Sequence, residues 1–172
     1  MNKTKNDILP KFGIGPYYFL SSLTLTILTL LYFNSIPFFQ SGIIVDDCLR
    51  KIFIFFSIVS MILGFLLWVF AVFPSKGILY KLKKGELEAE GVYSISRNPI
   101  YSGIYFFLLG IQMFTLNIFV FIVSIIIYEF LKILIIKTEE KWCLEKFGKK
   151  YEDYCEQVNR IIPWFPKRNK SK

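Results

Sequence analysis

The feature that most constrains this chain is an apolar run of 37 residues, from Ile100 to Ile136. As one straight helix the run would be about 55 Å long, nearly twice the roughly 30 Å thickness of a bilayer's hydrocarbon layer. The run must therefore turn. The best break is the stretch GIQMFTLN, residues 110–117, which contains glycine and polar residues. We predict two helices that pack as a hairpin around this break.

Two further apolar runs precede this region. The first is uncharged from Tyr17 to Phe33 and continues into the residues NSIPFF, giving one span with aromatic residues at both ends. The second, Ile52 to Phe73, would reach about 33 Å as a helix, which is enough to cross a bilayer. Hydrophobic residues make up 54% of the chain. The sequence therefore predicts an all-α integral membrane helical bundle of about four transmembrane helices.

The distribution of charge predicts how these helices are oriented. Lysines and arginines lie before the first span, between the second and third, and after the fourth, whereas the loop DDCLRK is short and balanced. Both termini should therefore be cytoplasmic, with a helical C-terminal tail on the same side as residues 77–98. The net charge of +8 suits the anionic surface of a cell inner membrane or an equivalent one. We expect the lipid bilayer as a partner, and no nucleic acid.

We expect one domain, residues 1–172, in which residues 1–73 form the N-terminal spans and residues 74–165 carry any site. The first ten residues contain no apolar core followed by small residues, so we expect no cleaved signal. Histidine is absent, and the three cysteines form no Cys-x-x-Cys pair. The chain thus lacks the usual general base, and its composition argues against a disulfide framework or a metal site.

A short polar motif, Arg97-Asn98-Pro99, stands at the start of the third apolar segment. Asn98 is a favoured N-cap residue and Pro99 a favoured first helical residue, so a helix should begin here at the cytoplasmic edge. The free amides of its first turn, with Arg97 beside them, would attract a carboxylate or a phosphate. A capped helix with a snorkelling arginine explains the same residues equally well.

A second polar cluster lies in the tail, where Glu139 and Glu140 directly follow the fourth span. Adjacent carboxylates repel each other and the anionic lipid surface, so the pair invites a cationic partner; the alternative is a solvated helix face. Gly148 should end one tail helix. A second tail helix should dock through an apolar stripe that consists of Tyr151, Tyr154, Cys155 and Val158.

Two other features have structural explanations. Glu129 and Lys132 lie inside the fourth apolar segment, three residues apart, where they can form an ion pair. Whether Glu129 also supports a neighbouring site stays open. The sequence PWFP, residues 163–166, is typical of an aromatic anchor at the membrane interface.

Taken together, the motifs resemble a family of membrane methyltransferases that includes the isoprenylcysteine carboxyl methyltransferases and the phosphatidylethanolamine N-methyltransferases. The resemblance extends over residues 91–163 and follows the family's order and spacing. It rests on Gly91-x-Tyr93, on Arg97-Asn98-Pro99-x-Tyr101-x-Gly103, on Glu139-Glu140, and on the tail FG-x-x-Y-x-x-Y that ends in Arg160-x-Ile-Pro.

The resemblance implies S-adenosylmethionine as the methyl donor, no metal, and a lipid-like acceptor that enters from the membrane. Asn98 stands where the isoprenylcysteine branch commonly carries histidine, so the acceptor group, whether carboxylate, amine or thiol, stays open, as does the oligomeric state. The catalytic residues that the resemblance implies are Arg97, Glu140 and Arg160. The implied cofactor-binding residues are Tyr93, Asn98, Pro99, Tyr101, Gly103, Glu139 and Glu140.

The residues are chemically suited to such a donor. Its sulfonium could face the acidic pair, its ammonium the nearby tyrosine rings, and its carboxylate the helix start with Arg97. Methyl transfer is an in-line displacement that depends mainly on alignment and exclusion of water, so the absence of histidine is tolerable.

Two other functions fit parts of the sequence. A related group of membrane sterol reductases resembles the C-terminal part and would use NADPH, although those proteins are usually longer and need basic groups for the additional phosphate. A non-catalytic membrane scaffold would use the motifs only as helix caps and anchors. A scaffold would leave Glu139 and Glu140 exposed.

Overall fold

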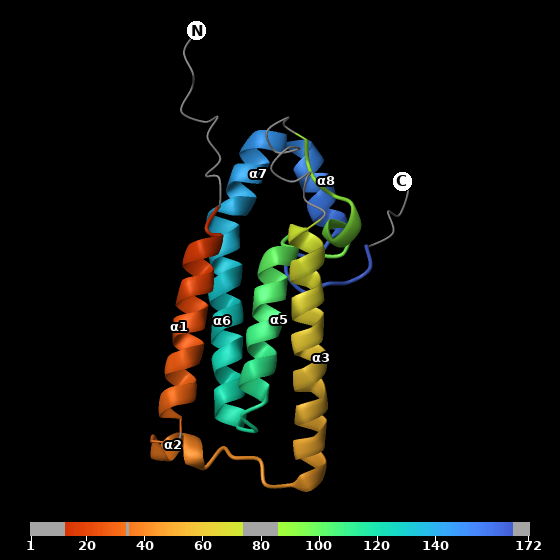
Figure 1. Ribbon diagram of the computed structural model, residues 1–172. Helices are drawn as coiled ribbons and strands as arrows, with labels where there is room; N and C mark the ends of the chain where they lie inside the picture. The colour runs from red at the N-terminus through yellow and green to blue at the C-terminus, as the bar shows by residue number, and fades with distance from the viewer. Residues whose placement is uncertain (1–12, 34, 74–85, 167–172) are drawn as a thin grey trace.

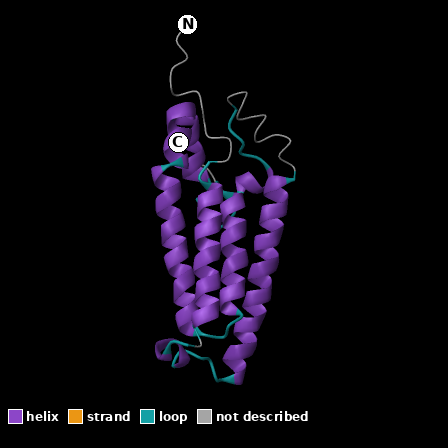
Figure 2. Ribbon diagram, turned by 60° about the vertical axis from the view of Figure 1, so that its left-hand side comes forward, coloured by secondary structure: helices purple, strands orange, loops and turns teal. Residues whose placement is uncertain are grey.

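Four long helices stand side by side and run alternately in opposite directions (Figures 1 and 2). They are α1 (Gly15–Tyr32), α3 (Asp47–Val72), α5 (Pro99–Met113) and α6 (Ile118–Lys137). This computed structural model describes residues 13–33, 35–73 and 86–166. The expectations for the first ten residues and for residues 74–85 fall outside the described residues. Within the described ranges the chain is helical and contains no β-strand, as the all-α prediction requires.

Helices α1 and α3 correspond to the first two predicted apolar runs. Helix α3 begins five residues earlier than the apolar run because Asp46 caps it: the Asp46 side chain accepts a hydrogen bond of 2.8 Å from the backbone N–H of Leu49. The prediction that the first span continues into NSIPFF is wrong. Helix α1 ends at Tyr32, and a separate short helix, α2 (Pro37–Gln40), follows. Pro37 forces the preceding Ile36 into an extended conformation, which breaks the helix.

The predicted hairpin is confirmed, with its turn between Met113 and Ile118. Asn117 begins α6, because its side-chain oxygen accepts hydrogen bonds from the backbone N–H groups of Phe119 and Val120. The connection between α2 and α3 closes this end of the bundle through an isolated antiparallel bridge between Ile43 and Asn117. The turn of the hairpin is thus tied to the neighbouring loop.

Helix α5 packs closely on α3 through glycine. An added Cβ at Gly64 would lie 2.4 Å from the backbone nitrogen of Phe107, and one at Gly103 would lie 2.8 Å from the carbonyl oxygen of Gly64. Two hydroxyl groups of α3 use this proximity: Ser57 donates to the carbonyl of Gly110 (2.6 Å), and Ser60 donates to that of Phe106 (2.7 Å). Small residues and hydroxyl bonds of this kind are typical of helix pairs in membranes.

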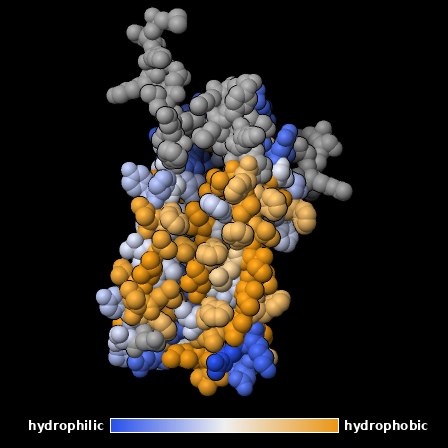
Figure 3. All heavy atoms as spheres, viewed as in Figure 1, coloured by the Kyte–Doolittle hydropathy of each residue, from blue (hydrophilic) through white to orange (hydrophobic). Residues whose placement is uncertain are grey.

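Two helical stretches are long and apolar enough to cross a membrane: α3, and the stretch Ile118–Phe147 that α6 begins. Helix α5 is shorter, with 15 residues and a length of about 22 Å. Large apolar side chains cover the outside of the bundle (Figure 3). Glu129 and Lys132 form the predicted ion pair on this outer surface, with 2.9 Å between Oε2 and Nζ.

The tail forms two short helices, α7 (Glu139–Phe147) and α8 (Lys149–Gln157), beyond the end of α6. Gly148 separates them with a φ of 52°, so its predicted role as a helix stop is confirmed. Tyr151, Tyr154 and Val158 are buried, and Cys155 packs against them, as the predicted stripe requires. The tail and the 3-10 helix η1 (Gly91–Ser94) lie at the same end of the bundle as the start of α5 (Figure 1).

The α3–α5 contact leads to a prediction about stability. Replacing Gly64 with alanine forces the two backbones apart, and overpacking of this kind costs about 1 to 3 kcal/mol. The midpoint of thermal unfolding in detergent should fall by about 2 to 12 °C. Ile62→Ala, on the exposed face of the same helix, is the control and should change it much less. An unchanged midpoint for Gly64→Ala would show that this contact is looser than described.

Candidate active site

A buried ion cluster occupies the end of the bundle that carries the tail. The carboxylate of Glu140, on α7, accepts two hydrogen bonds from Arg160, from Nε at 2.8 Å and from Nη2 at 2.9 Å. The same carboxylate lies 3.1 Å from Nη2 of Arg97, just before α5. The side chains of Arg97 and Glu140 are 8% and 9% exposed. Two guanidinium groups share one carboxylate, which leaves the cluster with one net positive charge.

The backbone after α8 returns to the start of α5 and brings Arg160 into this cluster. The N–H of Arg97 donates to the carbonyl of Asn159 (2.8 Å), and that of Trp164 donates to the carbonyl of Ile95 (3.0 Å). The predicted N-cap bond of Asn98 is absent, although α5 does begin at Pro99 as predicted. The Asn98 side chain instead donates to the carbonyl of Arg160 at 3.0 Å. The Arg160 carbonyl therefore replaces the N-cap contact that the sequence predicts for Asn98.

Two buried serines reinforce the same contact. The hydroxyl groups of Ser96 and Ser102 lie 2.9 Å apart, and Ser102 donates to the carbonyl of Ile161 at 2.5 Å. Both serines are fully buried. These bonds satisfy polar groups that would otherwise be costly to bury, so they fix the returning chain, and with it Arg160, against the first turn of α5.

Glu139 lies in a different environment from its neighbour. Its Oε1 accepts a hydrogen bond from the Tyr101 hydroxyl, which comes from α5, and another of 3.1 Å from the backbone N–H of Ile14. Among the described residues, no arginine or lysine pairs with this carboxylate and no donor bonds its Oε2. The two adjacent glutamates therefore differ: Glu140 is neutralised by arginine, whereas Glu139 is not.

Burial alters the acid–base behaviour of several groups around this cluster. It raises the pKa of Tyr93, and the nearby carboxylates of Glu88 and Glu139 raise it further. The hydrogen bonds to Glu140 raise the pKa of Arg160. Burial also raises the pKa of the Cys155 thiol. At neutral pH Tyr93 therefore stays a hydroxyl donor, Arg160 stays charged, and Cys155 stays a thiol rather than a nucleophilic thiolate.

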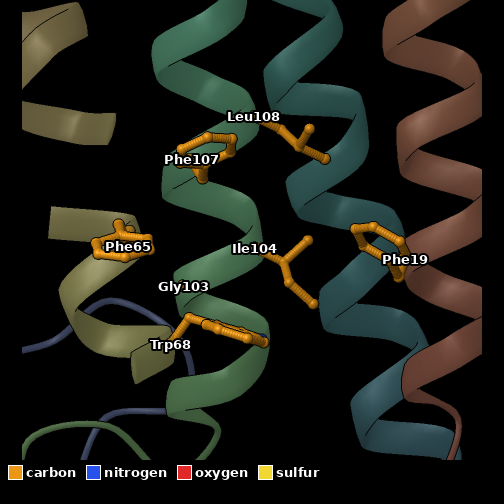
Figure 4. Close-up of a pocket in the computed structure, with 8 residues that line it drawn as sticks. Phe19, Phe65, Trp68, Gly103, Ile104, Phe107 and Leu108 are labelled. Carbon is orange, nitrogen blue, oxygen red and sulfur yellow. The ribbon is translucent and has the colours of Figure 1, made fainter. Parts of the chain in front are cut away.

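An apolar groove lies beside the site, between α1, α3 and α5, with a volume of about 200 Å³ (Figure 4). Gly103 forms part of its floor, one helical turn after Pro99. The predicted site residue Gly103 thus contributes to this groove and to the α3–α5 contact rather than to the polar cluster. Aromatic residues dominate the lining: Phe19, Phe65, Trp68 and Phe107.

The structure brings most of the predicted site residues to one place. The expected approach of the acidic pair to the start of α5 is found, because Glu139 meets Tyr101 and Glu140 meets Arg97. The reading of the pair as a solvated helix face is wrong, since Glu140 is buried and bonded. Sequence reasoning missed the contributions of Ser96, Ser102 and the backbone of Ile14. Only the glycines that flank Ile14 could have indicated a close backbone approach.

The fold and the site together define a class: a helical protein with two stretches long and apolar enough to cross a membrane and a charged site at one end of its bundle. Comparison with known proteins identifies the family. The phospholipid methyltransferase family matches residues 52–150, which is more than half of the chain. The chain therefore belongs to the phospholipid methyltransferase family, and the resemblance seen in its motifs is confirmed.

Two relatives are protein-S-isoprenylcysteine O-methyltransferases. That of Schizosaccharomyces pombe is 33% identical over 81 residues, which cover 46% of this chain and 34% of the relative. That of Saccharomyces cerevisiae is 35% identical over 75 residues, covering 43% and 31%. The chain thus spans about a third of the length of these curated relatives. No solved structure matches it. These findings favour methyl transfer over the reductase and scaffold alternatives.

The ion cluster yields a prediction about stability that separates the two glutamates. Glu140→Gln leaves the buried Arg97 side chain and the partly buried Arg160 side chain without a counter-charge, which costs about 3 kcal/mol. The midpoint of thermal unfolding in detergent should fall by roughly 6 to 12 °C. Glu139→Gln should change it much less, because glutamine can still accept from Tyr101 and Ile14. Glu145→Gln, on the exposed side of α7, is the control. Equal effects at 139 and 140 would contradict this division.

Proposed function

We propose that this protein transfers a methyl group from S-adenosylmethionine to a lipid-like acceptor at the edge of the membrane. Family membership supports the reaction class. The observation that carries the proposal further is Glu139, a half-buried carboxylate that is held by a tyrosine and a backbone amide but has no cationic partner among the described residues. Such a group is suited to a ligand that brings its own positive charge.

The residues present fit this donor. Glu139 would hold its ammonium group, which S-adenosylhomocysteine also carries, with Tyr93 and Tyr101 as neighbouring rings. Arg97 would take its carboxylate, since the Nε of Arg97 is buried and lacks a hydrogen-bond partner in the described structure. When bound, S-adenosylmethionine supplies a methyl group whose carbon is strongly electrophilic because it is attached to a positively charged sulfur. Glu140 would act by holding Arg97 and Arg160 in place, and Asn98 by holding the carbonyl of Arg160.

For the methyl acceptor we propose a chemical class, a molecule with a hydrocarbon chain and a reactive oxygen. The apolar groove beside Gly103 supports a hydrocarbon chain there, because it lies one helical turn from the start of α5 and its aromatic lining is partly exposed on the outer surface. The names of both relatives support an oxygen atom as the methylated group. A carboxylate acceptor would need no base, which suits a site that lacks histidine.

We further propose that all four long helices cross the membrane, with both termini and the helical tail in the cytoplasm and, in a bacterial cell, in the inner membrane. The alternating directions of the helices (Figure 1) support an even number of crossings. The excess of lysine and arginine at the end that carries the tail supports its cytoplasmic position. The donor, which is water-soluble, would then reach the site from the cytoplasm.

Donor binding provides the direct test of the function. The purified protein should bind S-adenosylhomocysteine in isothermal titration, and Glu139→Gln should weaken binding at least tenfold, because losing a charge-assisted contact costs about 1.5 to 3 kcal/mol. The control is Glu145→Gln, which removes one negative charge from the same helix, α7, and should bind within twofold of the wild type. Folded wild-type protein that gives no heat at millimolar ligand would exclude the methyltransferase function.

Cysteine labelling provides the test of topology. In a variant whose native cysteines are replaced by serine, Val45→Cys and Lys149→Cys each place a thiol at an exposed position at opposite ends of the bundle. An impermeant maleimide added to intact cells should label position 45 and leave position 149 unlabelled until the cells are opened. Labelling of both positions from the same side would rule out the four-crossing arrangement.

A further inference from the structure

The first residues of α1 make an unexpected contact with the candidate site. The backbone N–H of Ile14 donates to Oε1 of Glu139, although 125 positions separate the two residues in the sequence. Tyr101 donates its hydroxyl to the same oxygen. Both donors therefore act on one side of the carboxylate, and Oε2 is the oxygen left without a partner among the described residues. Two bonds to a single oxygen fix how the carboxylate is turned.

Gly13 makes this contact possible. Its φ of 55° lies in the left-handed region that favours glycine. A Cβ added at this position would lie only 2.2 Å from Oε1 of Glu139 and 3.2 Å from its Cδ. Any larger residue would therefore have to displace either the chain or the carboxylate. A glycine here lets the backbone approach Glu139 closely enough for Ile14 to donate.

Helix α1 itself is held in place beside this contact. The ring of Tyr18 packs edge-on against that of Tyr101, with 5.8 Å between centroids, and Tyr18 is fully buried. One turn of α1 thus rests on the residue that also bonds Glu139. The start of α1 lies beside the junction of α6 and α7 (Figure 1). The position of the Ile14 N–H is therefore set by packing and does not depend on Glu139 alone.

We infer that Gly13 and Ile14 form a positioning element for Glu139, which turns Oε2, the oxygen without a partner among the described residues, toward the ammonium group of the methyl donor. This inference rests on the proposed function and extends it to a part of the chain outside the family match, which begins at residue 52. Neither residue touches the donor in this scheme. They act by preventing the carboxylate from rotating away when the site is empty.

The test is the affinity of the purified protein for S-adenosylhomocysteine, measured by isothermal titration. Gly13→Ala should weaken binding at least tenfold, because the methyl group displaces Glu139. Gly148→Ala is the matched control: Gly148 has a similar φ of 52°, but an added Cβ meets nothing within 4 Å. Gly148→Ala therefore introduces the same kind of backbone strain as Gly13→Ala but no steric clash. This variant should bind S-adenosylhomocysteine within twofold of the wild type.

A second background separates positioning from general damage. In Glu139→Asp the carboxylate is one methylene shorter and is withdrawn from the added methyl group. Adding Gly13→Ala to Glu139→Asp should therefore weaken binding less than twofold further. If Gly13→Ala alone fails to fold, the double variant should recover folding. An equal loss in both backgrounds, or a double variant that fails to fold while Gly148→Ala folds, would overturn the inference.

The outcomes also separate this inference from the function on which it rests. Wild-type protein that is folded and does not bind S-adenosylhomocysteine would remove the proposed function, and the positioning role with it. Wild-type binding with unchanged affinity in Gly13→Ala would remove the positioning role alone. Both the proposed function and the positioning role are supported only if Gly13→Ala weakens binding in the protein with Glu139 and not in the Glu139→Asp variant.

Discussion

A carboxylate taken out of water must be compensated, and the burial of Glu140 sets this requirement for the whole end of the bundle. Removing an ion of this size from water costs several kcal/mol even after relaxation, so its partners must be held with good geometry. Arg97 arrives from the start of α5 and Arg160 from the chain after α8. Three segments that are distant in sequence are therefore obliged to meet. Hydrogen bonds from Ser102 to the Ile161 carbonyl and from Asn98 to the Arg160 carbonyl hold these segments together.

The difference between two adjacent glutamates shows how the site divides its tasks. Glu140 has a structural role, since its charge is already balanced by Arg97 and Arg160. Within the described part of the chain, Glu139 is held by uncharged donors alone, so its charge is available to a ligand. Neighbouring positions on a helix point about 100° apart, and that rotation is enough to give identical side chains opposite electrostatic surroundings. Composition alone does not distinguish the two residues.

Much of the architecture could be predicted from the sequence, because apolar runs of defined length translate directly into helices. The hairpin turn before Asn117, the stop at Gly148 and the docking face of α8 all follow from local rules. One error was local: Pro37 interrupts a helix that composition alone would have continued. Another arose from a distant segment: the Asn98 side chain bonds a carbonyl of the returning tail instead of capping its own helix. The glycines that flank Ile14 could indicate a close backbone approach, but they do not indicate Glu139 as the contact, because only the folded chain brings the two segments together.

The length of α5 has a consequence for where the reaction would occur. A helix of about 22 Å is shorter than the roughly 30 Å hydrocarbon layer. In the proposed four-crossing arrangement the bilayer would therefore thin around α5, or the ends of α5 would lie below the headgroups. Helix α3, with 26 residues, is long enough to cross without thinning. In either case the start of α5 would lie nearer to the acyl chains than the end of α3. A membrane lipid could then present its reactive group to Arg97 and Glu139 while its tails remain in their own leaflet.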